Sequence, residues 1–391
     1  MTKRVYMDYA ATTPVDPCVI EEMNRYLGPS DLFANPASSH WAGAEAKKAV
    51  EGARERIAHK LGAHPTEIVW TSGATESNNL ALKGVAAYYQ TKGRHIVTAR
   101  TEHKAVLDSA QALQSEGFEV TFLTPDESGV VHPDQIKSVL RNDTILVSLM
   151  HVNNEIGVIQ DIHAVADICR ARGVLFHVDG AQSVGKLPID LSRLPVDLLS
   201  FCAHKIYGPK GVGGLFVRRH PKVNLSPLQH GGGHEYGFRS GTVPSHLVTG
   251  FAHAVELAVD HMGVESTRIG TLKKRLYDGL RDTPRILLNG AVGTTVPNIL
   301  NVSFAGVEGE SLLHGLRNLA VSSGSACASA SREPSYVLRA LGRDDALAQA
   351  SIRFSLGRFS TESEVDFASA LVAEQVARLR DLAPECLISD I

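Results

Sequence analysis

From about Glu67 onward, the chain alternates short apolar segments rich in β-branched residues with longer amphipathic segments. This alternation is typical of βαβ units, and it constrains the fold more than any other feature of the sequence. The pattern begins with a strand expected at Ile68–Thr71 and a helix expected at Glu76–Tyr89. It continues with strands at His95–Thr98, Glu119–Leu123, Thr144–Leu149, Val174–Val178, Asp197–Phe201 and Leu215–Val217, the last closing the sheet, and a helix at Lys104–Ser115. The strands between 119 and 201 are apolar enough for burial on both faces, as in a parallel sheet covered by helices.

Near Val255 the pattern changes, and we predict a domain boundary there. The segment that follows combines a few strands with long helices. Its expected elements are a polar helix at Glu265–Arg281, strands at Ile286–Leu288, Ile299–Phe304 and Ser351–Phe354, and a C-terminal helix at Glu362–Leu382. A length of 391 residues fits two to three structural units, or one large α/β domain with a smaller companion.

The charge balance excludes some classes of partner. Lys and Arg number 39 against 42 Asp and Glu, a net charge of −3, so no general attraction to nucleic acid or to an anionic membrane is expected. The five cysteines are widely spread, with no C-x-x-C pair, which argues against a disulfide framework and a zinc site. Asp8 precedes any apolar leader segment, and no run of 18 apolar residues occurs. We therefore expect a reducing, cytoplasmic setting.

Polar residues follow several of the expected strands, where ligands bind in an open α/β sheet. Ser72–Glu76 opens a helix whose N–H groups and dipole favour a phosphate, to which Thr75 can add a hydroxyl group. A helix N-cap with no ligand is the alternative. Asp179 follows another strand, and His204 and Lys205 follow the next.

Asp179 and Lys205 could form no more than a salt bridge. Together with a phosphate-binding helix start, however, they meet the needs of pyridoxal phosphate. This cofactor requires a lysine for the Schiff base, an acid for the pyridinium nitrogen and a helix N-terminus for the phosphate.

Gly180–Lys186 matches G-x-x-x-x-G-K and follows a strand, as a nucleotide-binding P-loop would. The next residue is Leu187 rather than Ser or Thr, and Pro188 disfavours the helix that a P-loop needs, so we reject this interpretation. No resident metal is implied, because the histidines form no H-E-x-x-H motif and three glycines separate His230 from His234.

The sequence resembles the cysteine desulfurases of the IscS/NifS type in the class V aminotransferase family, from Tyr6 nearly to the C-terminus. The matching motifs are Ala10–Pro14, Asn35-Pro36, Thr71–Asn78, Thr101-Glu102-His103, His151–Gly157, His177-Val178-Asp179, His204–Gly211, Arg239–Thr242 and Ser323–Cys327. The long segment around Cys327, continuing to Tyr336, resembles the IscS branch rather than the SufS branch, whose loop is shorter.

The resemblance implies a homodimeric fold-type I pyridoxal phosphate enzyme. Its large domain, residues 15–255, would hold a seven-stranded, mostly parallel sheet. Residues 1–14 and 256–391 would form a smaller α+β domain with a mobile catalytic loop at 322–334. The small side chains of Ser322–Ser331 also favour a mobile loop.

The resemblance also implies a role for each site residue. Lys205 would carry the cofactor and shuttle protons, Asp179 would keep the ring nitrogen protonated, and His103 would stack on the ring and assist proton transfer. The other cofactor contacts would be Gln182 to the ring oxygen, Asn154 to the ring and substrate, and Ala74, Thr75, Cys202, His204 and the partner subunit's Thr242 to the phosphate. Arg353 with Asn35 would bind the substrate carboxylate, a bidentate task suited to guanidinium, although Asn35-Pro36 could also mark a plain turn.

Cys327 would separate a desulfurase from an aminotransferase. Its thiolate would attack the sulfur of cofactor-bound L-cysteine, leaving L-alanine and an enzyme persulfide. The sequence leaves open which acceptor dominates: an iron-sulfur scaffold protein, with which Cys327 is a candidate to share a cluster transiently, a tRNA-thiolation relay or a nitrogenase-assembly protein. A class V aminotransferase, a selenocysteine lyase and a scaffold-binding protein with a vestigial site are the alternatives.

Two features depart from the family pattern. Cys202 stands where IscS relatives have serine, and a thiol is the weaker donor to a phosphate. The sequence also ends at Ile391, whereas IscS relatives run somewhat further and use that tail in docking the scaffold.

Overall fold

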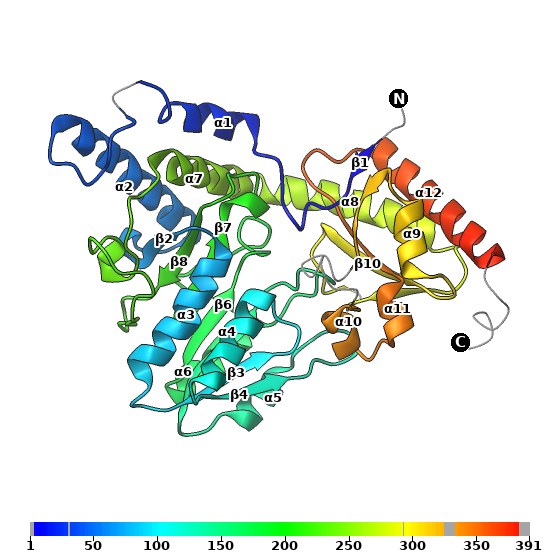
Figure 1. The fold of residues 1–391 in the computed structure, drawn as a ribbon, viewed down its shortest axis with the longest axis horizontal. Coiled ribbons are helices and arrows are strands. Elements are labelled where there is room, and N and C mark those ends of the chain that lie inside the picture. The colour runs from blue at the N-terminus through cyan, green and yellow to red at the C-terminus, as the bar shows by residue number, and fades with distance from the viewer. Residues whose placement is uncertain (1–3, 30–31, 292, 324–332, 383–391) are drawn as a thin grey trace.

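The computed structural model describes residues 4–29, 32–291, 293–323 and 333–382 (Figure 1). Its largest sheet has seven strands in the order β2-β8-β7-β6-β5-β3-β4. Their bounds are β2 Ile68–Thr71, β3 His95–Ala99, β4 Glu119–Leu123, β5 Thr144–Met150, β6 Leu175–Asp179, β7 Leu198–Cys202 and β8 Gly213–Val217. Each strand expected in this region forms, within two residues of its predicted limits.

Two details of the sheet differ from the prediction. β8 does not close the sheet but lies between β2 and β7, antiparallel to both. The connection from β7 to β8, residues 203–212, is too short for the helical crossover that a parallel pairing requires. β4 is one of the two edge strands, and Leu123 is its only buried residue, so the expected burial on both faces is wrong for this strand.

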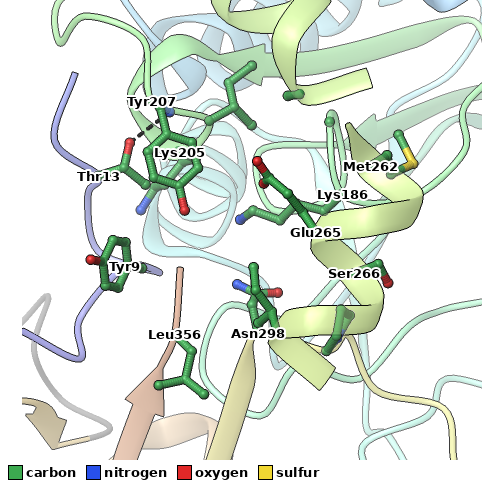
Figure 2. Close-up of a pocket in the computed structure, with 15 residues that line it drawn as sticks. Tyr9, Thr13, Lys186, Lys205, Tyr207, Met262, Glu265, Ser266, Asn298 and Leu356 are labelled. Atoms are coloured by element: carbon green, nitrogen blue, oxygen red, sulfur yellow. Dashed lines mark hydrogen bonds between the residues drawn. The ribbon is translucent and has the colours of Figure 1, made fainter. Parts of the chain in front are cut away.

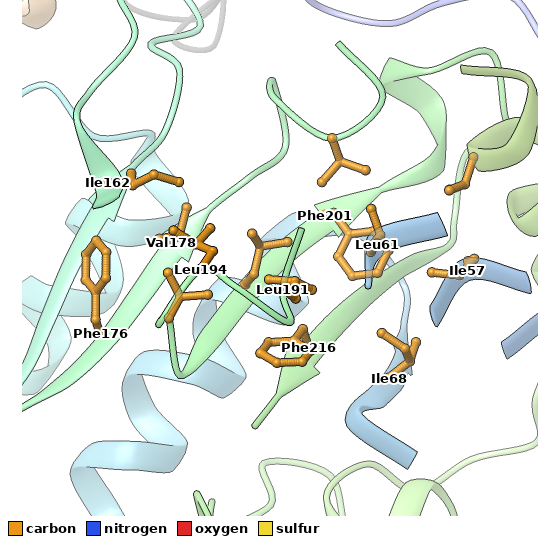
Figure 3. Close-up of a cluster of buried hydrophobic side chains, with 14 of the residues drawn as sticks. Ile57, Leu61, Ile68, Ile162, Phe176, Val178, Leu191, Leu194, Phe201 and Phe216 are labelled. Carbon is orange, nitrogen blue, oxygen red and sulfur yellow. The ribbon is translucent and has the colours of Figure 1, made fainter. Parts of the chain in front are cut away.

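Helices cover both faces of the sheet. On one face, α3 (Ala74–Tyr89) and α4 (Lys104–Ser115) pack on Val69, Ile96 and Leu215. On the other face lie α2 (Trp41–Leu61), α5 (Pro133–Val139), α6 (Ile162–Arg172) and α7 (Ser245–Asp260). Figure 3 shows part of the core on this other face, the large core, in which Phe176, Phe201 and Phe216 extend from the strands and Ile57 and Leu61 from α2.

A second, smaller core belongs to an antiparallel sheet in the order β12-β13-β10-β9. Its strands are β9 Ile286–Asn289, β10 Ile299–Phe304, β12 Ser322–Ser323 and β13 Ser351–Ser355, packed against α8 (Met262–Leu280) and α12 (Glu362–Asp381). β1 (Val5–Tyr6) pairs with β11 (Leu319–Ala320), so the N-terminal strand lies with this smaller core. The remaining helical elements are α1 Pro17–Asn24, α9 Gly309–Gly315, α10 Tyr336–Ala340, α11 Asp345–Gln349 and the 3-10 turns η1 Pro65–Glu67, η2 Ala203–Lys205 and η3 Glu235–Gly237.

The change from one core to the other occurs at the junction of α7 and α8. Ala258 still packs in the large core, whereas Ile269 packs in the small one. The predicted boundary at 255/256 falls inside α7, and the division into two domains stays a prediction. In the serine-rich segment, Ser322 and Ser323 are in β12 rather than in a loop, and residues 324–331 lie outside the described part of the chain.

Within the described ranges, no helix is both long and apolar enough to cross a membrane.

Candidate active site

A cavity of about 610 Å³ opens at the carboxyl ends of β2, β5, β6 and β7. Most of its wall comes from residues just beyond these strands, and Asp8–Thr12 and Arg353 complete it from the segments of the small core. Most of the site residues that the sequence predicts line this cavity: Ala74, Thr75, His103, Asn154, Asp179, Gln182, Cys202, His204, Lys205 and Arg353.

The start of α3 faces this cavity. The first N–H groups of a helix have no acceptor within the helix, and the N-cap residue Gly73 has no side chain to supply one. Glycine is favoured at position 73 by its φ of +152°, and Gly213 must also lack a side chain, because a Cβ there would lie 2.6 Å from the Gly73 Cα. Ala74 and Thr75 therefore present a helix N-terminus suited to a phosphate group.

Glu76 lies in the same turn, and its negative charge is balanced by a guanidinium group. Burial raises the pKa of Glu76, yet hydrogen bonds from Ser72 and Arg239 outweigh burial, so that the net pKa is lowered. Ser72 N donates to Glu76 Oε2 over 2.7 Å, and Arg239 Nε donates to Oε1 over 2.9 Å. The carboxylate charge is thus paired with a guanidinium and does not stand unopposed beside a phosphate.

Asp179 ends β6, and both of its carboxylate oxygens are held. Ala181 N donates to Oδ1 over 2.9 Å, and Asn78 Nδ2 donates to Oδ2 over 2.7 Å. Asn78 is buried in α3, and the sequence analysis assigned it no role. Its position one helical turn beyond the phosphate-binding start was the available signal, because that turn must face the same cavity.

Lys205 lies in η2, directly after β7. Its Nζ donates to Ala10 O over 2.5 Å and to Ala11 O over 2.7 Å. His204 precedes it, and burial lowers the pKa of His204 to about 4, so this imidazole is neutral at physiological pH. A neutral ring can donate one hydrogen bond without adding charge.

Two further cavity residues are fixed by hydrogen bonds. His103 caps α4, with its Nδ1 accepting from Ala105 N over 3.1 Å, so in the neutral ring the proton is on Nε2. Gln182 Nε2 donates to Ala10 O over 2.8 Å. Both side chains line the cavity, and the ring-stacking role of His103 and the ring-oxygen contact of Gln182 stay predictions.

Cys202 ends β7 and is buried at the cavity wall. Burial raises the pKa of the Cys202 thiol to about 11, while Ala74 N–H and the charge of Lys205 act in the opposite direction. The thiol is therefore protonated at neutral pH, a weak donor beside the helix start.

Arg353 reaches the cavity from β13. Its Nη2 donates to Asp8 Oδ1 over 2.7 Å and to Ser322 Oγ over 3.0 Å, and its Nη1 donates to Asn154 O over 2.8 Å. These contacts hold a guanidinium in the cavity wall. Asp8 and Ser322 are contacts that the sequence analysis missed, because only the fold brings them together.

Two predicted residues do not line this cavity. Asn35 is exposed, and its Oδ1 accepts from Ala37 N over 2.9 Å, which is the geometry of a turn. Thr242 is also exposed. Its action in a partner subunit's site and the substrate contact of Asn35 stay predictions.

Cys327 lies outside the described residues, but both flanks of its segment are placed. On one side, Ser322 contacts Arg353, as described above. On the other side, Ser335 Oγ donates to Glu155 Oε2 over 2.6 Å, and the Tyr336 hydroxyl donates to Glu102 O over 2.7 Å, next to His103. The described chain therefore leaves and re-enters beside the cavity.

The cavity wall contains buried polar atoms without hydrogen-bond partners, and these fit a polar ligand such as pyridoxal phosphate. Among the described residues, the buried side-chain atoms lacking a hydrogen bond include three from the cavity wall: Asn78 Oδ1, Asn154 Oδ1 and Arg353 Nε. Buried polar groups are rarely left unpaired, so such a group of atoms indicates a polar ligand. No set of three metal-ligating side chains occurs in the part of the chain that the structure describes.

Three features meet at the strand ends of one α/β sheet: Lys205, Asp179 with both carboxylate oxygens hydrogen-bonded, and the N-terminus of α3. Together they define a fold-type I pyridoxal phosphate enzyme. The chain belongs to the class-V aminotransferase family, whose model matches residues 5–367. The resemblance, fold class, enzyme class and cofactor that the sequence predicts are thereby confirmed.

Curated relatives and solved structures agree with this assignment. The chain is 58% identical over 381 residues to "Cysteine desulfurase IscS" of Serratia proteamaculans, covering 97% of this chain and 94% of the relative. The same identity and coverage hold for the protein of that name from Escherichia coli O139:H28. A solved NifS-like protein is 39% identical, with a TM-score of 0.90 over 96% of this chain and all of the other. A structure titled "SspA in complex with cysteine" is 39% identical, with a TM-score of 0.81 over 92% of this chain and all of the other.

Proposed function

We propose that this protein is a cysteine desulfurase, which converts L-cysteine to L-alanine and passes the sulfur to acceptor proteins through an enzyme persulfide. The observation that carries the proposal is the meeting of Lys205, Asp179 and Arg353 in one cavity, with both flanks of the Cys327 segment beside it. The 58% identity to relatives named cysteine desulfurase supports the same activity.

The large-domain side of the cavity would hold the cofactor. Lys205 would bind it covalently, Asp179 would pair with the ring nitrogen, and the start of α3 would hold the phosphate. When bound, pyridoxal phosphate withdraws electrons from the substrate's α-carbon. His103 and Lys205, which both line the cavity, are the groups placed to move protons at the substrate carbon atoms.

Arg353 would bind the substrate carboxylate and so help to fix the position of the substrate sulfur. The Cys327 thiolate then attacks that sulfur. An S–S bond forms to Cys327, the C–S bond breaks, and its electron pair remains on the substrate carbon, which takes up a proton on the way to alanine. The persulfide on Cys327 carries the sulfur to the acceptor.

The test uses the purified protein with L-cysteine. We expect stoichiometric alanine and, after reduction, sulfide, with no need for a keto acid. A brief pulse of L-cysteine should add one sulfur to the Cys327 peptide in mass spectrometry, and Cys327→Ala should abolish alanine formation while retaining bound cofactor. A keto-acid requirement would indicate an aminotransferase, activity on selenocysteine alone a selenocysteine lyase, and a colourless, inactive protein a vestigial site.

The proposed enzyme is a cytoplasmic homodimer that supplies an iron-sulfur scaffold and a tRNA-thiolation relay. In such a dimer, Thr242 acts on the phosphate of the partner's site. Mixed Lys205→Ala and Thr242→Ala chains should therefore form some hybrid dimers with one site free of both changes, and regain activity that neither variant has alone. A monomer in sedimentation at working concentration would exclude the shared site.

A further inference from the structure

Lys186 ends the Gly180–Lys186 motif that resembles a P-loop, and the proposed function gives it no task. In the structure, it lies behind the active site, at a small cavity of about 40 Å³ that also touches Lys205. Figure 2 shows its side chain extending across this cavity, with Glu265 on one side and Asn298 on the other. A second lysine so close to Lys205 needs an explanation, because two enclosed ammonium groups repel each other.

The Lys186 amine contacts a cofactor-site residue directly. Lys186 Nζ donates to Gln182 Oε1 over 2.7 Å, and Gln182 Nε2 donates to Ala10 O over 2.8 Å. A lysine amine paired with an amide oxygen acts as the donor, and a backbone carbonyl can only accept. The two contacts together fix which end of the Gln182 amide is nitrogen.

This orientation leaves one N–H of Gln182 for the active site. An amide nitrogen has two N–H groups, and Ala10 O takes one of them. Gln182 lines the large cavity, so the second N–H is the group it can offer to a ligand there. If the amide were flipped, its oxygen would face the cavity and repel an anionic ring oxygen.

We propose that Lys186 is a positioning residue, which holds the Gln182 amide so that its nitrogen donates to the ring oxygen of pyridoxal phosphate. The proposal rests on the proposed function, since that function supplies the cofactor. The small cavity can hydrate the Lys186 amine, because it has room for a water molecule. Asn298 Oδ1, which lacks a partner among the described residues, can accept a hydrogen bond from that water.

The charged and titratable groups around Lys186 come from several elements. Lys205 after β7 and Arg353 on β13 oppose its charge, and Cys202 at the end of β7 favours it. Glu265 on α8 and Tyr207 after η2 line the same small cavity, as does Tyr9. Burial and the like charges lower the pKa of Lys186 to about 7, and the neutral amine can still donate to Gln182 Oε1.

The test compares holoenzymes that carry Lys186→Met and Lys186→Arg with the wild type. Losing one donated hydrogen bond should raise the dissociation constant of pyridoxal phosphate about 2- to 12-fold in Lys186→Met. The ring oxygen then holds a proton more readily, so the pH-dependent change of the visible absorbance should move to higher pH. Lys186→Arg, which keeps the donor, should restore both values toward the wild type.

Two further variants make the outcome specific. Gln182→Ala should reproduce the spectral shift, and adding Lys186→Met to it should cause no further change, since both act through one contact. Lys273→Met is the matched control, because Lys273 is another partly buried lysine, bonded to Thr295 Oγ1 and Val296 O away from the large cavity. It should leave the spectrum unchanged.

Lys186→Met with the affinity and pH profile of the wild type would overturn this proposal alone. If Lys186→Met does not fold, Lys186→Ala takes its place as the variant without a donor, and additive effects of Lys186→Ala and Gln182→Ala would overturn the proposal, because independent sites add and coupled ones do not. A wild-type protein without bound cofactor would overturn the proposed function as well.

Discussion

The two walls of the active-site cavity are held in different ways. On the wall formed by the seven-stranded sheet, which we call the large-domain wall after the predicted division, Asp179 ends a buried strand and is fixed by Ala181 N and by Asn78 from a neighbouring helix. On the opposite wall, Arg353 is held by Asp8 and Ser322, which come from the N-terminal segment and from the short strand β12. One wall rests on a continuous seven-stranded sheet, and the other on contacts between distant segments.

This difference matches two tasks. A cofactor must stay bound through many turnovers, which favours a site at the ends of buried strands. A substrate must enter and leave, and Arg353 already has a carboxylate partner, Asp8, that a substrate carboxylate can join or replace. We therefore expect changes on the large-domain wall to affect cofactor binding and changes on the small-domain wall to affect KM.

The largest effect is expected for Lys205→Ala on the large-domain wall. Without this amine, no covalent bond to the cofactor can form, so the protein should lose its borohydride-reducible visible absorbance and all measurable desulfurase activity. Lys210→Ala is the control, since Lys210 also lines the cavity but follows η2 by several residues, and it should keep the absorbance. Peptide mapping after reduction that finds the label on Lys210 or Lys186 would contradict the assignment.

The next largest effect is expected for Arg353→Lys on the opposite wall. A lysine keeps the charge but loses the planar set of N–H donors, and a hydrogen bond to a charged group contributes about 1.5–3 kcal/mol. We expect KM for L-cysteine to rise about 10- to 100-fold, with the dissociation constant of pyridoxal phosphate within about twofold of the wild type. A large loss of cofactor affinity in this variant would show that the two walls do not divide the tasks.

The sequence predicted the large-domain wall better than the small-domain wall, and the reason is structural. Residues such as Asp179 and Lys205 follow directly on apolar strands, so that their place at the sheet edge can be read from the local pattern. Asp8 contacts Ser322 and Arg353 although more than 300 residues separate it from either one, and no local sequence pattern predicts such contacts.

The same limit explains the errors in the fold. The antiparallel β8 and the exposed edge strand β4 have the apolar composition of the other strands, and only the order of pairing distinguishes them. Asn78 and Lys186 were within quoted motifs, yet their roles depend on contacts with Asp179 and Gln182 that the motifs do not specify.

A smaller effect is expected for Asn78→Ala, which removes one of the two contacts that hold Asp179. Ala181 N still fixes the other carboxylate oxygen, so the aspartate stays in place with more freedom. We expect kcat to fall about 10-fold, the equivalent of about 1.4 kcal/mol, while KM changes little. Asn79→Ala, one residue along α3 with its Nδ2 bonded to Thr75 O, is the neighbouring control for helix stability. Equal losses of kcat in the two variants would mean that Asn78 acts only through the helix.

The smallest effect is expected for Cys202→Ser on the large-domain wall, and this change should improve cofactor binding rather than weaken it. The Cys202 thiol stays protonated, since burial raises its pKa to about 11, and it is a poorer hydrogen-bond donor than a hydroxyl group. A serine at the same place beside Ala74 can donate to the phosphate, and one added hydrogen bond of about 0.5–1.5 kcal/mol would tighten cofactor binding about 2- to 12-fold. Titration of the cofactor-free protein with pyridoxal phosphate measures this change.

Cys169→Ser is the matched control for Cys202→Ser, because Cys169 is a buried cysteine in α6, within the large core and away from the cavity. It should lower the thermal stability without changing the dissociation constant. Markedly weaker binding in Cys202→Ser would instead mean that the thiol packs as an apolar group and that the new hydroxyl lacks a partner, a cost of about 1–3 kcal/mol. In that case, the α3 N-terminus and His204 would hold the phosphate without the side chain at position 202 of β7. Phosphate binding on the large-domain wall would then depend on backbone N–H groups more than on side chains.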